Sequence, residues 1–146
     1  MIEYRIKKIA ADISEIGDRF LIYEYIISMG NDLPEILPED RTEDKLVRGC
    51  QNPLWLDHTY VNLFDGSKSN EQGDRLLFTA YSESQIVRGM VEIIFYIYRD
   101  ESIESIKSSN SKCLDKLGIK SILTSRRLGG LESLIGHMRK IAHKYE

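Results

Sequence analysis

The chain has 146 residues, of which 42% are hydrophobic and 29% charged, enough for one globular domain, 1–146, with a substantial core. Its formal net charge of −3 argues against nucleic-acid binding, which normally requires a basic domain with clustered lysines and arginines. Apolar runs fall short of the roughly 20 residues that span a bilayer, and charges interrupt the first residues where a signal peptide would be continuously apolar. We therefore expect a soluble, cytoplasmic protein.

Two helices are predicted at the start of the chain, because apolar residues recur at helical spacing over 2–13 and over 20–27. The apolar face predicted for the second helix consists of Phe20, Tyr23 and Ile27. Asp18 can cap this helix by accepting hydrogen bonds from its first N–H groups, and Gly30 can end it in a left-handed conformation. Two prolines then predict an irregular surface connection over 31–44.

Three strands are predicted in the middle of the chain, over 45–49, 54–64 and 75–81. The segment 66–73 contains no apolar residue, and we expect it to form a mobile hairpin loop. Short links between consecutive strands predict an antiparallel meander. Trp55 is expected to fill the core beneath a helix.

The best-specified helix follows the strands. Ser82 and Gln85 form a capping-box pattern, and apolar residues keep the helical period beyond it. Short helices are expected over 102–107 and 111–117, and the stretch SILTSRRLGG is expected to be a turn before a C-terminal amphipathic helix. Helices at both ends of the chain predict an α+β fold, with a three-stranded antiparallel sheet packed against the N- and C-terminal helices.

Cys50 is the leading candidate for chemistry. Gly49 lets the backbone bend beside the sulfur, and Pro53 prevents a strand from continuing, so the thiol has an approach path. If the strand extends to Cys50, its period of two places Arg48 on the same face, where a cation would lower the pKa of the thiol. The alternative is that Cys50 is a small buried hydrophobe, which is the common role of free cysteine.

Other candidate sites have weaker patterns. Cys113 is far from Cys50 in the sequence and lacks metal-ligand spacing, so we expect two free thiols, with Cys113 packed in the core. The histidines stand on different predicted elements at unrelated spacings, which argues against a metal site or a Cys–His hydrolase pair; they are His58, His137 and His143. Gly129-Gly130 lacks the third glycine and the preceding strand of a phosphate-binding loop.

Three groups of residues together resemble the SufE family of sulfur-acceptor proteins. They occur in the family's order and at nearly its separations, from the second predicted helix onward. The groups are Leu33-Pro34 with Gly49-Cys50-Gln51 and Trp55, Ser82-Glu83-Ser84 with Ile86-Val87-Arg88-Gly89-Met90, and Leu123-Thr124-Ser125-Arg126-Arg127 with Gly130-Leu131. The chain departs from the usual family residues at Lys45, Asn52, Leu54, Ser125 and Arg126, and its 66–73 loop is longer than in familiar members.

The resemblance implies a SufE/NifU-like fold and a mechanism of sulfur transfer. A pyridoxal-phosphate cysteine desulfurase holds sulfur from cysteine as a persulfide, and the Cys50 thiolate would attack its terminal sulfur. The resulting Cys50 persulfide would supply iron-sulfur cluster assembly, and the transfer would stimulate the desulfurase. The implied partners are a SufS-like desulfurase and a SufBCD-type scaffold. The chain would be no enzyme in its own right and would hold no cofactor or metal, since the pyridoxal phosphate belongs to the desulfurase.

The resemblance also implies how the thiol is presented to its partner. Glu83 and Arg127 match family positions for an acidic residue near the partner surface and an arginine near the active cysteine, and Arg48 is a third candidate for partner binding. The alternative for Glu83 is a first-turn acid favoured by the helix dipole, and Arg126 and Arg127 have the alternative of solvated loop charges. We expect Cys50 to be tucked toward apolar neighbours until the partner docks, because an exposed thiolate oxidises readily.

Two other functions stay open at this level. One is a regulatory binding module for a desulfurase that accepts no sulfur itself. The other is a small thiol hydrolase that pairs Cys50 with a histidine.

Overall fold

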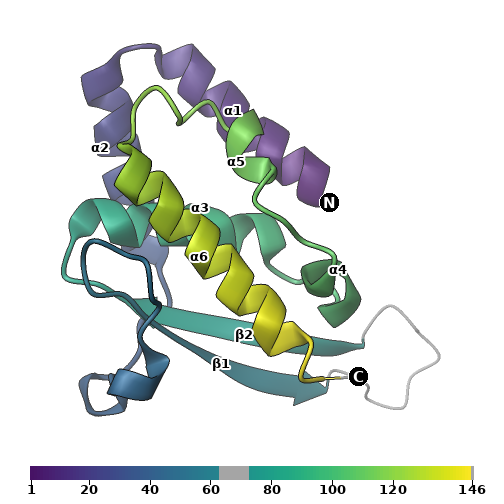
Figure 1. Ribbon diagram of the computed structural model, residues 1–146. Coiled ribbons are helices and arrows are strands. Elements are labelled where there is room, and N and C mark those ends of the chain that lie inside the picture. Colours follow the sequence, from purple (N-terminus) through teal and green to yellow (C-terminus); the bar gives the residue numbers. More distant parts are fainter. Residues whose placement is uncertain (63–72, 146) are drawn as a thin grey trace.

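The computed structural model describes residues 1–62 and 73–145, in which six α-helices lie to one side of one antiparallel β-hairpin (Figure 1). The α-helices are α1 (Ile2–Ile16), α2 (Arg19–Met29), α3 (Gln85–Tyr98), α4 (Ile103–Lys107), α5 (Cys113–Lys116) and α6 (Ser125–Ala142). The strands are β1 (Trp55–Asn62) and β2 (Asp74–Tyr81), and three short 3-10 turns, η1 (Gly30–Asp32), η2 (Pro38–Asp40) and η3 (Glu43–Lys45), precede them. The α+β class predicted from the sequence is confirmed.

The two N-terminal helices form as predicted, although the buried face of the second is only partly the predicted one. Ile6, Ile9 and Ile13 of α1 are buried, and Asp18 caps α2 by accepting a hydrogen bond from the Leu21 N–H at 3.0 Å. In α2, however, the buried residues are Ile22 and Ile26, and the Phe20 side chain is 76% exposed. The prediction was wrong for Phe20 and missed the centre of the buried face, whereas Tyr23 and Ile27 are partly buried against the core. Most positions of this helix are apolar, so the periodicity does not select one side sharply.

Helices α2 and α3 pack closely at a pair of glycines. Gly30, directly after α2, has right-handed helical dihedrals, so the predicted left-handed ending is wrong. A Cβ atom on Gly30 would lie 3.0 Å from the Gly89 backbone nitrogen, and one on Gly89 would lie 1.9 Å from the Ile26 carbonyl oxygen. These glycines are therefore needed for the close approach of the two helices.

The sheet has two strands instead of the predicted three. Strands β1 and β2 pair from Trp55 opposite Tyr81 to Asn62 opposite Asp74. The predicted strand 45–49 is reduced to one antiparallel bridge between Leu46 and Trp55. It cannot continue, because a 3-10 turn occupies 43–45 and the backbone turns at Gly49, where φ is +94°. The last two residues predicted for the second strand, 63–64, and most of the predicted 66–73 loop lie outside the described residues.

Helices cover one face of the hairpin. Leu56, Leu76 and Ala80 are buried on that face, and Phe78 stacks on Phe95 of α3 with ring centroids 6.0 Å apart. Trp55 alternates onto the opposite face, where it packs against Tyr81 with ring centroids 6.2 Å apart. Trp55 is only partly buried, so its predicted place beneath a helix is wrong.

Helix α3 is the most buried helix and passes behind α6 in Figure 1. Its N-cap is Ser84, whose hydroxyl accepts a hydrogen bond from the Val87 N–H at 3.4 Å, two residues later than the capping box predicted at Ser82. Ser82 is buried, and its hydroxyl accepts instead from the Ser84 N–H at 3.3 Å. The helix itself is confirmed, together with its apolar core positions.

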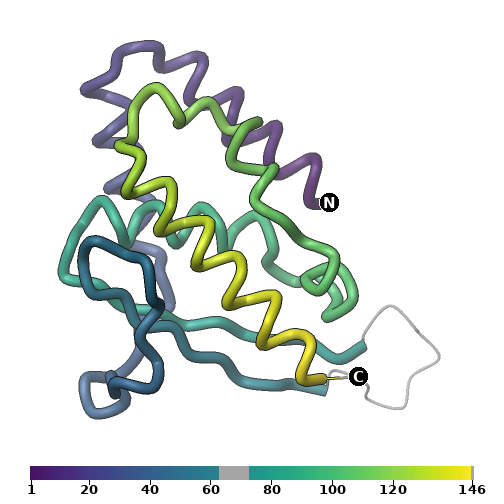
Figure 2. Tube along the Cα trace, in the orientation of Figure 1, coloured from purple at the N-terminus to yellow at the C-terminus, as the bar shows by residue number. Residues whose placement is uncertain are grey.

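Helix α6 begins earlier than predicted. Thr124 caps it by accepting a hydrogen bond from the Arg127 N–H at 3.2 Å, so Arg126 and Arg127 lie in the first helical turn and not in a loop. The double glycine that suggested a turn is inside the helix. In the tube of Figure 2, α6 runs from the segment after α5 down to the hairpin, with the chain around Cys50 beside it.

No helix in the described residues is both long enough and apolar enough to cross a bilayer.

Candidate functional site: the Cys50 loop and its two cavities

Cys50 lies in a tight loop that leaves and rejoins the edge of the hairpin. The Val47 N–H donates to the Leu54 carbonyl at 2.8 Å and closes the loop at its base. Between these two residues the chain turns through Gly49 and carries Cys50 out of any strand. The alternation that would place Arg48 and Cys50 on one face of a strand is therefore not observed.

The loop rests on helix α6 by close contacts that only small residues allow. The Cys50 Sγ lies 3.7 Å from the Gly130 carbonyl oxygen, toward which it can donate a weak hydrogen bond. A Cβ on Gly130 would lie 3.2 Å from the Cys50 Sγ, and one on Gly49 would lie 2.6 Å from the Ser133 Oγ. Gly49 and Gly130 thus hold the thiol against the helix.

Cys50 is half-buried and packs at the margin of the hydrophobic core, in agreement with the expectation of a sheltered thiol. Burial raises the pKa of the Cys50 thiol, because desolvation disfavours the thiolate. Arg48 is exposed and does not contribute to this shift, so the predicted lowering of the pKa by Arg48 is wrong for the free protein.

We expect Cys50 in the free protein to react with iodoacetamide more slowly than an unfolded cysteine at pH 7 to 8. The raised pKa leaves a smaller thiolate fraction, so the rate should rise with pH through an inflection above the ordinary value of about 8.5. The rate would be measured in a Cys113→Ser background, folded and in urea. A folded rate equal to or faster than the unfolded rate would contradict the sheltered arrangement.

We expect Gly49→Ala to release the loop from α6. The left-handed backbone costs an alanine about 1–2 kcal/mol, and the new methyl group would overlap the Ser133 hydroxyl. Unfolding in urea should show the loss of stability, and alkylation of Cys50 should become faster. In the double variant with Ser133→Ala the overlap is removed while the backbone strain remains, so the loop should return and slow alkylation should be restored. Unchanged alkylation in the single variant would show that the contact does not hold the loop.

A small cavity of about 20 Å³ lies on the inner side of the thiol. Its lining is Cys50, Gln51, Asn52, Leu54, Val87, Met90, Arg126, Arg127, Gly130 and Leu131. Arg127 is fixed there by donating to the Tyr23 hydroxyl at 2.6 Å, while its Nε is buried with no hydrogen-bond partner among the described residues. The sequence did not indicate Tyr23, because it lies 104 positions away from Arg127.

A larger cavity of about 740 Å³ opens on the other side of Cys50. Three segments line it: the loop and the residues before it, β1, and the C-terminal half of α6 with the turn after it. Its polar residues include Arg48, His58, His137, Lys140 and Lys144. The helical spacing of His137 and Lys140 on α6, continued by Lys144 just after the helix, was the signal in the sequence that could have identified this side of the cavity.

The histidines in this cavity contact groups other than the thiol. His137 Nδ1 lies 2.9 Å from the Ser133 carbonyl, and His58 Nε2 lies 2.8 Å from the Tyr145 hydroxyl. Neither forms a hydrogen bond with the Cys50 Sγ among the described residues, and burial together with the nearby Lys144 lowers the pKa of His58. The geometry therefore gives no support to a Cys–His hydrolase. Within 1–62 and 73–145, no three His, Cys, Asp or Glu side chains are placed to hold a metal ion.

The three residues predicted to bind a partner are not all in one place. Arg48 lines the large cavity and Arg127 the small one, so both flank Cys50. Glu83 is exposed just before the N-cap of α3 and lines neither cavity. The structure thus brings two of the three to the thiol.

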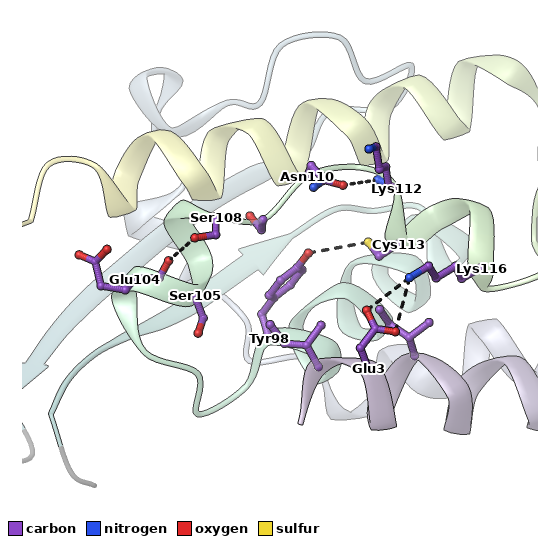
Figure 3. A pocket seen from close by; sticks show the side chains of 12 residues that line it. Glu3, Tyr98, Glu104, Ser105, Ser108, Asn110, Lys112, Cys113 and Lys116 are labelled. Carbon is purple, nitrogen blue, oxygen red and sulfur yellow. Dashed lines mark hydrogen bonds and ion pairs between the residues drawn. The ribbon is translucent and has the colours of Figure 1, made fainter. Parts of the chain in front are cut away.

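Cys113 belongs to a separate pocket of about 470 Å³ between α1, α4 and α5 (Figure 3). Its Sγ faces the Tyr98 hydroxyl at 3.8 Å, and only 6% of the residue is exposed. Burial raises the pKa of the Cys113 thiol as well. Its predicted role in the core is confirmed.

Fold and site together define a small α+β protein that presents one half-buried thiol on a glycine-hinged loop between two cavities. Residues 7–142 match the family model of SufE, described as an Fe-S metabolism associated domain. The chain belongs to the SufE family.

Curated relatives and a solved structure agree with this assignment. The chain is 30% identical over 140 residues to an uncharacterized SufE-like protein of Rhizobium etli, with 90% of each chain covered. It is 31% identical over 121 residues to the cysteine desulfuration protein SufE of Wigglesworthia glossinidia brevipalpis, covering 82% of this chain and 77% of that one. The solution structure of a hypothetical protein from Thermus thermophilus has the same fold, with a TM-score of 0.71 at 15% identity over 96% of this chain and 94% of that one.

Proposed function

We propose that Cys50 accepts sulfur from the persulfide of a pyridoxal-phosphate cysteine desulfurase, and that by doing so the protein stimulates that enzyme for iron-sulfur cluster assembly. The observation that carries the proposal is the position of Cys50 on a loop between two cavities, in a chain of the SufE family. A relative named as a cysteine desulfuration protein supports the same chemistry. The protein itself would need no cofactor, because the pyridoxal phosphate stays on the desulfurase.

The proposed step is a thiol exchange at a sulfur–sulfur bond. The Cys50 thiolate attacks the outer sulfur of the donor persulfide, the donor cysteine leaves as a thiolate, and a persulfide forms on Cys50. No external oxidant or reductant is consumed. Because burial raises the pKa of Cys50 in the free protein, the thiolate must be favoured on docking, by a cation or by release of the loop.

Arg48 and Arg127 are our candidates for favouring the thiolate, since each lines a cavity that Cys50 also lines. We assign Glu83 to the partner surface as well, at a distance from the thiol, because its carboxylate is exposed before α3. A SufS-like enzyme is the proposed donor and a SufBCD-type scaffold the proposed acceptor. Binding to the donor and binding to the acceptor would both occur in the cytoplasm, where thiols stay reduced.

The experiment is incubation of the protein with a SufS-like desulfurase and cysteine, followed by intact mass and peptide mapping under non-reducing conditions. We expect one added sulfur atom on the peptide that contains Cys50. Faster desulfurase turnover without any added sulfur would instead favour a regulatory binding module. An unchanged mass and unchanged turnover would overturn the proposal.

A further inference from the structure

The large cavity beside Cys50 has the dimensions and charges of a small-molecule site. Its volume of about 740 Å³ falls within the range of about 300–1,000 Å³ that is usual for ligand pockets. Residues from three separate segments line it, so it is a built cavity and not the flank of one helix. Cys50 is part of the lining, so a molecule bound there would lie next to the sulfur.

Three basic side chains of the cavity lie along one wall, and Arg48 adds a guanidinium group from the Cys50 loop. His137 and Lys140 lie on one side of α6, and Lys144 lies in the turn just after the helix ends at Ala142. Lys144 is close enough to His58 on β1 to lower its pKa. Neither Lys140 nor Lys144 forms an ion pair within the described part of the chain.

The anions of the cavity stand on a different segment. Lys45 and Asp57 form an ion pair at 3.0 Å and largely neutralise each other. The carboxylates that remain are Glu43 and Asp44, both exposed on the 3-10 turn before the Cys50 loop. The cavity therefore offers ammonium groups from α6 and the turn after it, the Arg48 guanidinium from the loop, and carboxylates from the η3 turn, which together are complementary to a ligand that carries both charges.

We propose that this cavity binds a zwitterionic low-molecular-weight aminothiol, such as a free amino-acid thiol or a short peptide thiol, which then takes the outer sulfur from persulfidated Cys50. The inference rests on the proposed function, because it requires a persulfide on Cys50. The ligand carboxylate would bind near Lys140 and Lys144, and its ammonium group near Glu43 and Asp44. This arrangement adds a small-molecule route for sulfur to the protein scaffold route.

The transfer step balances without a further reactant. The aminothiol loses its proton to solvent, and its thiolate attacks the outer sulfur of the Cys50 persulfide. The bond between that sulfur and the Cys50 Sγ breaks while a new sulfur–sulfur bond forms to the small molecule. Cys50 leaves as a thiolate and takes a proton from water, and the transferred sulfur keeps its oxidation state.

The test uses the full chain loaded chemically, so that it does not depend on a desulfurase. Cys50 is persulfidated with inorganic polysulfide in a Cys113→Ser background, and excess polysulfide is removed. L-Cysteine, N-acetylcysteine, cysteine ethyl ester and 2-mercaptoethanol are then compared at equal thiolate concentrations, and the small-molecule persulfide is trapped by alkylation and measured by mass spectrometry. We expect the rate of sulfur transfer to saturate as the L-cysteine concentration rises, and to increase linearly with the concentration of 2-mercaptoethanol.

Matched variants separate recognition from intrinsic reactivity. The double variant Lys140→Gln, Lys144→Gln should lower the rate of sulfur transfer to L-cysteine about tenfold, because it loses about one hydrogen bond to a charged group. The rate of transfer to 2-mercaptoethanol should not change. Lys7→Gln, on the exposed surface of α1, is the control and should change neither. S-Methylcysteine, which cannot accept sulfur, should slow alkylation of unloaded Cys50 in the wild type but not in the double variant.

The inference would be overturned if the transfer rate rose linearly with concentration for all four thiols, or if the double variant lowered the transfer rate equally for all of them. Protection by S-methylcysteine that survives in the double variant would overturn it as well. If instead the chemically loaded protein behaves as expected but a desulfurase never loads Cys50, the cavity is a thiol site and the proposed function is wrong.

Discussion

Cys50→Ser is expected to abolish sulfur loading by the desulfurase, while Cys113→Ser leaves loading at the wild-type level. Serine cannot form a persulfide, and Cys50 is the cysteine on the loop whose side chain lines both cavities. Cys113 is 6% exposed and faces the Tyr98 hydroxyl, so it presents far less of its surface to a partner protein than the half-buried Cys50 does. Loading would be measured by intact mass and by desulfurase turnover.

The two cysteine variants should differ in their effects on stability. Cys50 is half-buried, so its serine variant should change the free energy of unfolding by less than about 1 kcal/mol. In the core the serine hydroxyl at position 113 must be desolvated, which should cost about 1–3 kcal/mol. Urea unfolding of both variants provides the comparison. Loading that persists in Cys50→Ser, or that disappears in Cys113→Ser, would place the acceptor thiol elsewhere.

Gly89→Ala is expected to destabilise the fold by at least about 3 kcal/mol, at or beyond the upper end of ordinary overpacking. The added Cβ would lie 1.9 Å from the Ile26 carbonyl oxygen and 2.6 Å from its carbon, which are backbone atoms of α2. Backbone cannot rotate away as a flexible side chain can, so α2 and α3 must separate. That separation would open the core around Ile26, which is fully buried.

Gly136→Ala is the matched control for this prediction. Gly136 also lies inside a helix, but nothing surrounds the position that its Cβ would occupy within 4 Å. The same substitution there should stabilise the protein by about 0.5–1 kcal/mol, because alanine loses less conformational entropy on folding. Urea denaturation followed by circular dichroism measures both. Equal effects at the two positions would show that the glycine contact between α2 and α3 is not tight.

The elements that could be predicted are those whose sequence signal is local. The core face of α1 follows from regular spacing, and the cap of α2 from Asp18, a residue that competes well for free N–H groups. The strand predicted over 45–49 failed because a 3-10 turn and the positive φ of Gly49 interrupt it, and neither has a strong signature in the residues themselves. The start of α6 was missed because Gly129-Gly130 suggested a turn, whereas Gly130 serves a contact with Cys50, 80 positions away.

The candidate site shows the same division between local and distant information. Cys50 could be singled out because the glycine before it and the proline after it shape the loop locally. The charges of the large cavity could not be grouped, since η3, β1 and α6 approach one another only in the folded chain. The hydrogen bond between Arg127 and Tyr23 likewise results from helix packing, and the positions of the two residues in the sequence do not predict it.

Trp55 sits where the Cys50 loop rejoins the hairpin, bridged to Leu46 on the other side of the loop and packed against Tyr81. It is the one tryptophan of the chain. Its indole emission is therefore an intrinsic optical probe at the base of the loop, sensitive to any shift in solvent contact when the loop leaves α6. Stopped-flow fluorescence could follow partner association in real time with unlabelled protein, provided that the partner's own tryptophans are replaced or subtracted.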